Sequence, residues 1–272
     1  MNVLELAVSS IRIGQRVSPK LAGIAARELF MRPRKLEPRD WERDAAARSR
    51  TEVIDGLNVR TWGEAGSAVV FLHGWEGRST QWAPFAQRVA SLNHRAIALD
   101  GPAHGFSDGT IAHPFAFADA LMRIDRVLGP FEGAAGHSMG AGAISLALLQ
   151  GFRAKRVALI AGPSRLDWVV EHFANRLGLS EPTQWQFKEA VKRTTGVGVE
   201  QADLARRASK LETKALIVHD REDDEVQFAH AEEYAQHWPN VELDVVEGLG
   251  HRRIIRDHEV QKRVVEFLLT RP

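Results

Sequence analysis

The residues Gly136-His137-Ser138-Met139-Gly140 follow a run of small residues and lead directly into a helical pattern. In a G-x-S-x-G motif of this kind a strand turns sharply into a helix, and the glycines leave room for the strained residue between them. The turn would expose the Ser138 hydroxyl at the N-terminus of a helix, where the helix dipole favours negative charge. Ser138 is therefore a candidate nucleophile, although a Gly/Ser turn before a helix can also be purely structural.

Short apolar runs alternate with helical patterns on both sides of this motif. Strands buried on both faces are predicted at 59–62, 68–72, 95–99, 133–136, 157–161, 215–218 and 241–246. Helices are predicted at 80–91, 115–128, 139–150, 228–237 and 259–269. This alternation indicates an α/β fold with a mostly parallel central sheet flanked by helices and joined by right-handed crossovers. A chain of 272 residues can bury one such core.

The first 50 residues are predicted to form a helical extension. Apolar residues recur at helical spacing between Leu4 and Met31, with a break at Ser18-Pro19 that indicates two helices. The simplest expectation is that this extension packs across the main domain. A membrane-surface helix or a dimerisation helix is the alternative.

A second segment, residues 164–211, also interrupts the alternation. It contains helical pieces rich in large apolar residues and no clear strand. We interpret it as a helical cap inserted over a binding cleft, with a second helical layer as the alternative. The α/β core then consists of residues 51–163 and 212–272.

Composition narrows the classes of function. With 36 Lys and Arg against 35 Asp and Glu, the net charge of +1 gives no field that would attract nucleic acid. The absence of cysteine excludes disulfides, thiolate metal sites and a cysteine nucleophile. The N-terminus does not have the pattern of a signal peptide, and no uncharged run approaches the roughly 20 residues of a spanning helix. We therefore expect a soluble, cytoplasmic protein.

Upstream of the serine motif, Val69-Val70-Phe71-Leu72-His73-Gly74-Trp75 has the pattern of a buried strand that ends in a His-Gly turn. Together with the serine motif, this order resembles the α/β-hydrolase family. The resemblance covers roughly residues 53–269, apart from the inserted segment. In that family the loop after the third strand and the residue after the serine supply the donors of an oxyanion hole. The resemblance implies the backbone N–H groups of Trp75 and Met139. His73 is then expected to be a hydrogen-bonded turn residue.

Asp100-Gly101-Pro102-Ala103-His104-Gly105-Phe106-Ser107 resembles the family's D-x-P-G-H-G-x-S turn, with Ala103 where glycine is common. We expect this loop to shape the fold rather than to take part in the reaction.

The candidate acid follows the predicted strand 215–218, where the sequence reads His219-Asp220-Arg221-Glu222-Asp223-Asp224-Glu225-Val226. The family pattern that it resembles is G-x-x-D-x-x-V. Aligning the valine with Val226 places the acid at Asp223 and leaves Asp220 in the glycine position, so Asp220 and Asp224 stay alternatives. The surplus carboxylates lack the regular spacing and glycine of a calcium loop, and no metal site is expected.

The candidate base lies in Gly248-Leu249-Gly250-His251, after the last predicted strand and before the closing helix. Among the 11 histidines, only His251 has the position that the family's chain order of Ser, Asp, His requires. An imidazole can take the serine's proton near neutral pH and return it to the leaving group. His137 is expected to pack behind the serine.

These residues predict a serine hydrolase that cleaves an ester or thioester of a small to medium, partly apolar substrate through an acyl-enzyme intermediate. The candidate pocket residues are Trp168, Phe173 and Trp185. No cofactor is expected. The expected partner is a small-molecule acyl substrate, and the N-terminal helices could also join copies of the chain. The alternatives are a non-catalytic ligand-binding or sensor protein and a carbon–carbon bond hydrolase on the same fold.

Overall fold

The computed structural model describes residues 3–198 and 203–270. Contacts divide the chain into two compact units. The larger unit consists of Arg34–Ser164 and Leu204–Pro272, and the smaller unit consists of Met1–Pro33 and Arg165–Asp203. Each unit is therefore built from two separate stretches of the chain.

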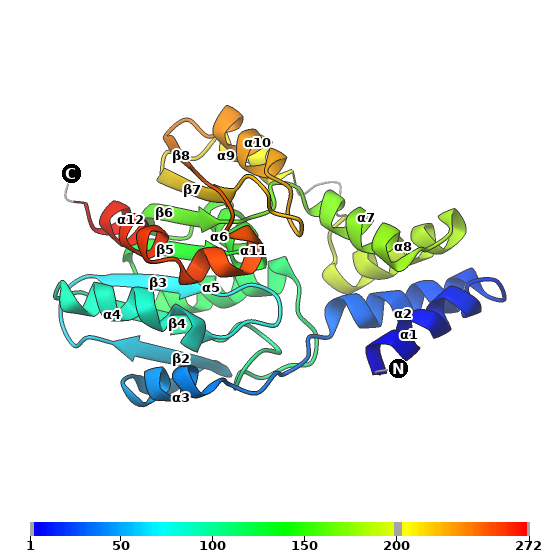
Figure 1. Cartoon of the computed structure of the whole chain (residues 1–272), viewed down its shortest axis with the longest axis horizontal. Coiled ribbons are helices and arrows are strands. Elements are labelled where there is room, and N and C mark those ends of the chain that lie inside the picture. Colours follow the sequence, from blue (N-terminus) through cyan, green and yellow to red (C-terminus); the bar gives the residue numbers. More distant parts are fainter. Residues whose placement is uncertain (1–2, 199–202, 271–272) are drawn as a thin grey trace. The chain divides into compact units, whose positions relative to one another are not determined.

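A single sheet of eight strands forms the centre of the larger unit within the described residues (Figure 1). The strands are β1 (Arg50–Ile54), β2 (Leu57–Trp62), β3 (Ala68–Leu72), β4 (Arg95–Leu99), β5 (Phe131–His137), β6 (Ala154–Ile160), β7 (Lys214–Asp220) and β8 (Val241–Val246). Their order in the sheet is β1-β2-β4-β3-β5-β6-β7-β8. The pairs β1–β2 and β2–β4 are antiparallel, and all other neighbouring strands pair parallel. The predicted mostly parallel sheet is confirmed.

Strand β1 has no counterpart among the predicted strands. Its side chains are mostly exposed, so it lacks the apolar run by which buried strands were identified. It forms a hairpin with β2 through Asp55 and Gly56, whose φ angles of 50° and 74° are those of a tight hairpin turn. The Asp-Gly pair is the sequence signal that indicates this hairpin.

Helices cover both faces of the sheet (Figure 1). Helices α4 (Ala83–Ser91) and α12 (His258–Leu269) pack on one face, and α5 (Pro114–Leu128) and α6 (Met139–Leu149) pack on the other. Alternate strand residues such as Val69 and Phe71 join the side chains of α4 and α12 in one buried cluster, as the two-residue period of a strand requires. The other elements of this unit are α3 (Asp40–Ala47), η1 (Ser79–Trp82), α9 (Leu204–Ala208), α10 (Ala229–His237), α11 (Gly250–Arg253) and η3 (Ile254–Arg256).

The smaller unit is helical and consists of α1 (Val3–Gly14), α2 (Pro19–Met31), α7 (Leu166–Leu177) and α8 (Glu181–Thr195). Helix α2 begins with the Ser18 side chain accepting a hydrogen bond from the Leu21 amide, followed by Pro19, both of which favour a helix start. The Phe30 ring packs against Phe173 and Phe187, with ring centroids 4.8 and 5.5 Å away. The N-terminal helices thus share a unit with the inserted segment.

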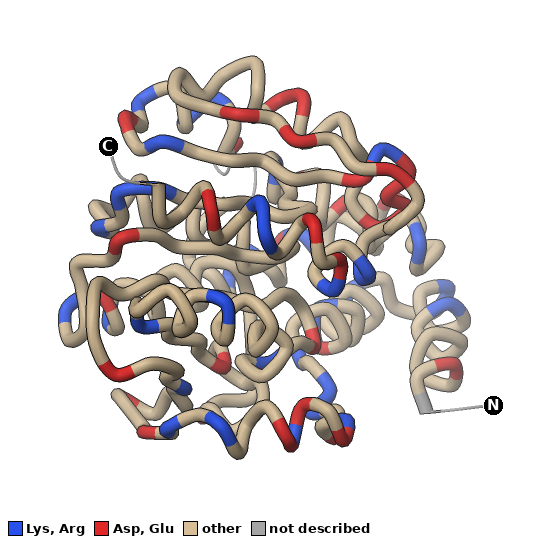
Figure 2. The backbone as a smooth tube through the Cα atoms, turned by 60° about the vertical axis from the view of Figure 1, so that its left-hand side comes forward, with Lys and Arg blue, Asp and Glu red and all other residues tan. Residues whose placement is uncertain are grey.

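Charged residues of both signs are interspersed along the chain, as the near-zero net charge suggests (Figure 2). In the ranges 3–198 and 203–270, no helix is both long enough and apolar enough to cross a membrane.

We expect Gly23→Ala to destabilise the smaller unit, because α2 and α8 meet closely at this glycine. An added Cβ would lie 2.7 Å from Gln186 Cβ and 2.8 Å from the Phe187 backbone nitrogen, and such overpacking costs about 1–3 kcal/mol. Gly14→Ala is the matched control, since no atom lies within 4 Å of its added Cβ. Urea unfolding followed by circular dichroism measures both. A Gly23→Ala midpoint equal to the wild-type midpoint would contradict the close packing.

Candidate active site

The turn between β5 and α6 places Ser138 in a strained conformation. Its φ of 53° and ψ of −120° are rare for a residue with a side chain. The flanking residues Gly136 and Gly140 must be glycines, because neighbouring backbone atoms leave no room for a side chain at either position. A Cβ on Gly136 would lie 2.6 Å from the Gly140 carbonyl oxygen, and a Cβ on Gly140 would lie 2.2 Å from the Leu72 carbonyl oxygen. The Ser138 amide donates to the Ile160 carbonyl at 2.9 Å, which ties the turn to the neighbouring strand.

A continuous chain of hydrogen bonds joins Ser138, His251 and Asp223. The Ser138 Oγ lies 2.9 Å from His251 Nε2, and His251 Nδ1 lies 2.8 Å from Asp223 Oδ2. Because a carboxylate only accepts, Nδ1 carries the proton and Nε2 is free to accept from the serine hydroxyl. His251 and Asp223 are buried, whereas Ser138 is half-buried. The structure thus brings together the three side chains predicted as nucleophile, base and acid.

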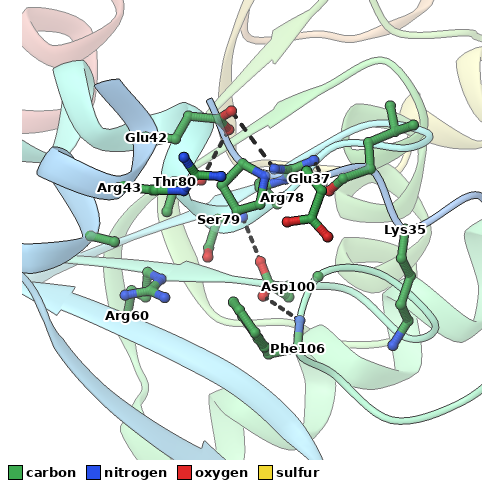
Figure 3. Close-up of a pocket in the computed structure, with 14 residues that line it drawn as sticks. Lys35, Glu37, Glu42, Arg43, Arg60, Arg78, Ser79, Thr80, Asp100 and Phe106 are labelled. Carbon is green, nitrogen blue, oxygen red and sulfur yellow. Dashed lines mark hydrogen bonds and ion pairs between the residues drawn. The ribbon is translucent and has the colours of Figure 1, made fainter. Parts of the chain in front are cut away.

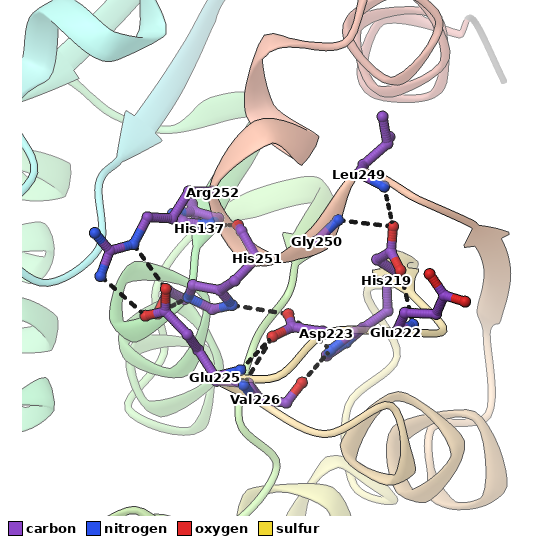
Figure 4. Close-up of polar contacts among 12 residues, drawn as sticks. His137, His219, Glu222, Asp223, Glu225, Val226, Leu249, Gly250, His251 and Arg252 are labelled. Carbon is purple, nitrogen blue, oxygen red and sulfur yellow. Dashed lines mark hydrogen bonds and ion pairs between the residues drawn. The ribbon is translucent and has the colours of Figure 1, made fainter.

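The acid loop holds Asp223 by its second oxygen (Figure 4). Asp223 Oδ1 accepts hydrogen bonds from the amides of Glu225 and Val226, both at 2.9 Å. Burial alone would raise the pKa of Asp223, but hydrogen bonds from His219, His251 and the Val226 amide lower it well below its ordinary value. The carboxylate therefore stays ionised and can orient His251. Asp224, one of the two alternative acids, is exposed.

Asp220, the other alternative, has a different environment. Its Oδ2 accepts from the amides of Leu249 at 2.6 Å and Gly250 at 2.9 Å, and its Oδ1 accepts from the Glu222 amide at 2.7 Å. Burial opposes ionisation, but these three amides lower the pKa of Asp220. The carboxylate in the family's glycine position therefore connects the loop that carries Asp223 to the residues directly before His251. The family pattern gave no reason to expect this connection.

The His-Gly loop after β3 lies directly beside Ser138. A Cβ on Gly74 would lie 2.9 Å from Ser138 Cβ, so only glycine permits this approach. His73 is buried and donates from Nδ1 to the Gly74 carbonyl at 2.7 Å, while its Nε2 accepts from the Gly101 amide at 2.9 Å. Trp75 follows in this loop, and Met139 is the first residue of α6, where helix amides lack intrahelical acceptors. Their role as oxyanion donors stays a prediction.

The loop after β4 is held by Asp100 and Ser107. Asp100 Oδ1 accepts from the Ser79 amide at 2.6 Å, and Ser107 Oγ donates to the Asp100 carbonyl at 2.6 Å while accepting from the Asn58 amide at 2.8 Å. Ala103 has a φ of 64°, which explains why glycine is common at this position of the family pattern. These bonds connect three segments of the larger unit and support its shape.

Three buried histidines surround these loops in their neutral form. Burial lowers the pKa of His104 to about 3, with a further contribution from His73. Burial and the neighbouring His251 lower the pKa of His137 to about 3, and burial also lowers the pKa of His73. His104 Nε2 accepts from the Glu76 amide at 3.0 Å, and His137 Nε2 donates to the His251 carbonyl at 2.8 Å. His137 therefore supports the backbone of the candidate base.

The predicted pocket residues belong to the smaller unit. Phe173 packs against Phe30 and Phe187, Trp168 stacks on His172 with ring centroids 4.6 Å apart, and Trp185 is exposed. Their contribution to a substrate pocket stays a prediction. Over the part of the chain that the structure describes, no group of three or more His, Asp or Glu side chains could hold a metal ion.

Comparison with known proteins identifies the fold. A model of the alpha/beta hydrolase family matches residues 69–264. No curated protein matches the sequence. Solved structures are similar, among them an esterase from Exiguobacterium antarcticum with 19% sequence identity and a TM-score of 0.61, covering 80% of this chain and 98% of that protein.

Two further structures agree with this assignment. The thioesterase domain from the curacin biosynthetic pathway is 15% identical, with a TM-score of 0.61 and coverage of 82% of this chain and 99% of that domain. A meta-cleavage product hydrolase from Pseudomonas fluorescens IP01 is 17% identical, with a TM-score of 0.58 and coverage of 80% and 96%. At these identities the likeness shows the fold, and the fold expected from the sequence motifs is confirmed.

We expect Asp220→Ala to destabilise the protein by about 3 kcal/mol, because it leaves three backbone amides without their acceptor. Asp224→Ala, which removes an exposed carboxylate from the same loop, is the matched control and should change the free energy of unfolding by less than about 0.5 kcal/mol. Urea unfolding at neutral pH measures both variants. Equal effects at the two positions would show that Asp220 does not connect the loops.

The depressed pKa values of His104 and His137 predict acid sensitivity. The unfolded chain takes up protons below a pKa of about 6.5, whereas the folded protein keeps these two side chains neutral until about pH 3. Stability should therefore be complete above pH 6.5 and fall as the pH decreases from 6.5 towards 3, by up to about 1.4 kcal/mol per pH unit for each histidine.

His104→Gln tests this origin, because glutamine keeps an acceptor for the Glu76 amide and does not titrate. We expect lower stability at pH 7 but a shallower loss between pH 6.5 and 4, measured by urea unfolding at a series of pH values. An unchanged slope would rule out His104 as a source of the acid sensitivity.

Proposed function

Because the chain belongs to the alpha/beta hydrolase family, we propose that it is a serine hydrolase with Ser138 as its nucleophile, His251 as its base and Asp223 as the acid that orients the base. One observation carries the proposal: the unbroken sequence of hydrogen bonds from the Ser138 hydroxyl through His251 to Asp223, at 2.9 and 2.8 Å. A nucleophile, a base and an orienting carboxylate within hydrogen-bonding distance are the requirement for nucleophilic catalysis by serine.

In the first half of the proposed reaction, Ser138 Oγ attacks the carbonyl carbon of the substrate. Its proton passes to His251 Nε2, and the positive imidazolium is stabilised by the ionised Asp223. The carbonyl oxygen becomes negative and would accept hydrogen bonds from the amides of Trp75 and Met139. His251 then returns the proton to the leaving alcohol or thiol, and the acyl group stays on Ser138.

In the second half, a water molecule donates its proton to His251 and attacks the acyl carbon. The same donors would stabilise the second oxyanion, and His251 returns the proton to Ser138 Oγ as the carboxylic acid leaves.

The proposed substrate is an ester or thioester of small to medium size with an apolar part. This choice is supported by the large aromatic side chains Trp168, Phe173 and Trp185 in the inserted segment, since apolar and aromatic residues predominate in small-molecule pockets.

Ser138→Ala should lower the hydrolysis of p-nitrophenyl acetate, butyrate and octanoate by at least about 10⁴-fold, the order of loss expected for a catalytic serine. Ser91→Ala, at an exposed position on α4, is the control and should keep wild-type activity. A fluorophosphonate probe should label Ser138 in the folded wild-type protein, as read by mass spectrometry of the labelled peptide.

Retention of hydrolysis by Ser138→Ala would refute the proposed mechanism. Failure of the probe together with no hydrolysis by the wild-type protein would favour a non-catalytic binding protein. The substrate panel should also include thioesters and carbon–carbon bond substrates. Labelling of Ser138 without hydrolysis of the p-nitrophenyl esters would favour one of these two substrate classes.

A further inference from the structure

The larger unit contains a cavity that is lined by residues other than the candidate catalytic ones. Its volume is about 520 Å³, within the range of small-molecule sites. Its walls come from the connector residues 35–38, helix α3, strand β2, the loop after β3 and the loop after β4 (Figure 3). Ser138, Asp223 and His251 do not line it.

Three buried polar atoms that line this cavity have no hydrogen-bond partner within the described residues. They are Arg60 Nε, Arg78 Nη1 and Ser79 Oγ. Their residues are only 9%, 7% and 1% exposed. Buried polar atoms are nearly always paired, because each unpaired one costs free energy comparable to a lost hydrogen bond. All three can donate, so together they form a set of donors without an acceptor.

Three carboxylates line the cavity, and two of them, Asp100 and Glu42, are held by other donors. Both oxygens of Asp100 accept from other groups, the Ser79 amide at 2.6 Å and the Asn58 side chain at 2.8 Å. Glu42 Oε2 forms an ion pair with Arg78 Nη1 at 3.7 Å but no hydrogen bond, and the Glu42 oxygens accept from the Arg39 amide and the Thr80 hydroxyl. The third, Glu37, is exposed. Within the described residues none of the three carboxylates forms a hydrogen bond with the buried donor atoms.

The positive charge of Arg60 is less compensated than that of Arg78, which has an ion pair with Glu42. Arg60 Nη1 donates to the hydroxyls of Ser49 and Thr51, which are neutral. Burial lowers the pKa of Arg60, and Asp100 offsets this only in part. A buried guanidinium without a carboxylate at hydrogen-bonding distance is costly, and an anion of a ligand would remove that cost.

The cavity is also fixed and partly apolar. Arg78 Nη2 donates to the Leu36 carbonyl at 2.5 Å, and Lys35 Nζ donates to the Ser107 carbonyl at 3.1 Å, so the connector is attached to the loops that it faces. Leu36 and Phe106 line the cavity and are 48% and 72% exposed. An anionic group at the buried donors would thus have apolar side chains available for the rest of the ligand.

We propose that this cavity binds a small organic anion, with a carboxylate or phosphate group on Arg60, Arg78 and Ser79 and an apolar body against Leu36 and Phe106. The shared chemistry is an oxyanion with several acceptor oxygens, which matches guanidinium donors well. The site lies outside the proposed catalytic residues and does not depend on their activity.

Isothermal titration calorimetry of the full chain tests this with benzoate, phenyl phosphate, inorganic phosphate and uncharged benzyl alcohol. We expect binding of one equivalent of an aromatic anion and no binding of benzyl alcohol. Tighter binding of benzoate would assign a carboxylate ligand, and tighter binding of phenyl phosphate would assign a phosphate ligand. Inorganic phosphate bound as tightly as phenyl phosphate would contradict the apolar part of the site.

Two variants locate the binding. Arg60→Met keeps the length of the side chain without its charge and should weaken binding about tenfold or more, as expected for hydrogen bonds to a charged group. Ser79→Ala should weaken it several-fold while keeping the wild-type urea midpoint, because its hydroxyl has no partner to lose. Arg263→Met, which removes one positive charge from α12, should bind like wild type.

The proposal is overturned if none of the anions binds at millimolar concentration, or if their affinity is the same in wild type, Arg60→Met and Ser79→Ala. Loss of stability in Ser79→Ala would also contradict it, since the hydroxyl would then have a structural partner. Because no readout involves hydrolysis, these outcomes are independent of the result for Ser138.

Discussion

The sharp turn at Ser138 is the constraint on which the rest of the larger unit depends. A residue with a side chain at a φ of 53° is unfavourable, and it persists because the surrounding structure leaves no alternative. Gly136 and Gly140 allow the backbone to reverse, and the carbonyl of Leu72 closes the space on one side. The neighbouring strands β3 and β6 end beside this turn, at Leu72 and Ile160, and both contact it. The position of Ser138 therefore depends on the register of the parallel sheet.

Several loops at this edge of the sheet are joined by buried polar groups rather than by apolar contacts. His73 bonds the amide of Gly101, and His137 bonds the carbonyl of His251. Asp220 bonds the amides of Leu249 and Gly250. Hydrogen bonds are directional, so they fix the position of a side chain more narrowly than packing does. An arrangement that must align a hydroxyl, an imidazole and a carboxylate needs this kind of support.

Much of the larger unit could be predicted from the sequence, because buried parallel strands leave uninterrupted apolar runs. Strands β3, β4 and β8 agree with the predicted ranges at both ends. Strand β1 could not be found in this way, since its side chains are exposed and only Asp55-Gly56 marks it. The motif register placed Asp223 beside His251, where the structure has it. The bonds of Asp220 could not be predicted, because they depend on backbone amides from a loop almost thirty residues further along the chain. The cavity at Arg60 could not be predicted either, because its lining comes from separate segments between residues 35 and 106 that only the fold brings together.

The division of the smaller unit between two distant stretches of chain has a consequence for how the protein is made. Helices α1 and α2 leave the ribosome well before α7 and α8, against which α2 packs its Phe30. With roughly 130 residues between them and translation at about 5–20 residues per second, the delay is on the order of ten seconds. During that time the face of α2 that packs on α8 lacks its native partner. Until α8 is synthesised, this face is an exposed apolar surface of the kind that makes incompletely folded chains prone to aggregate.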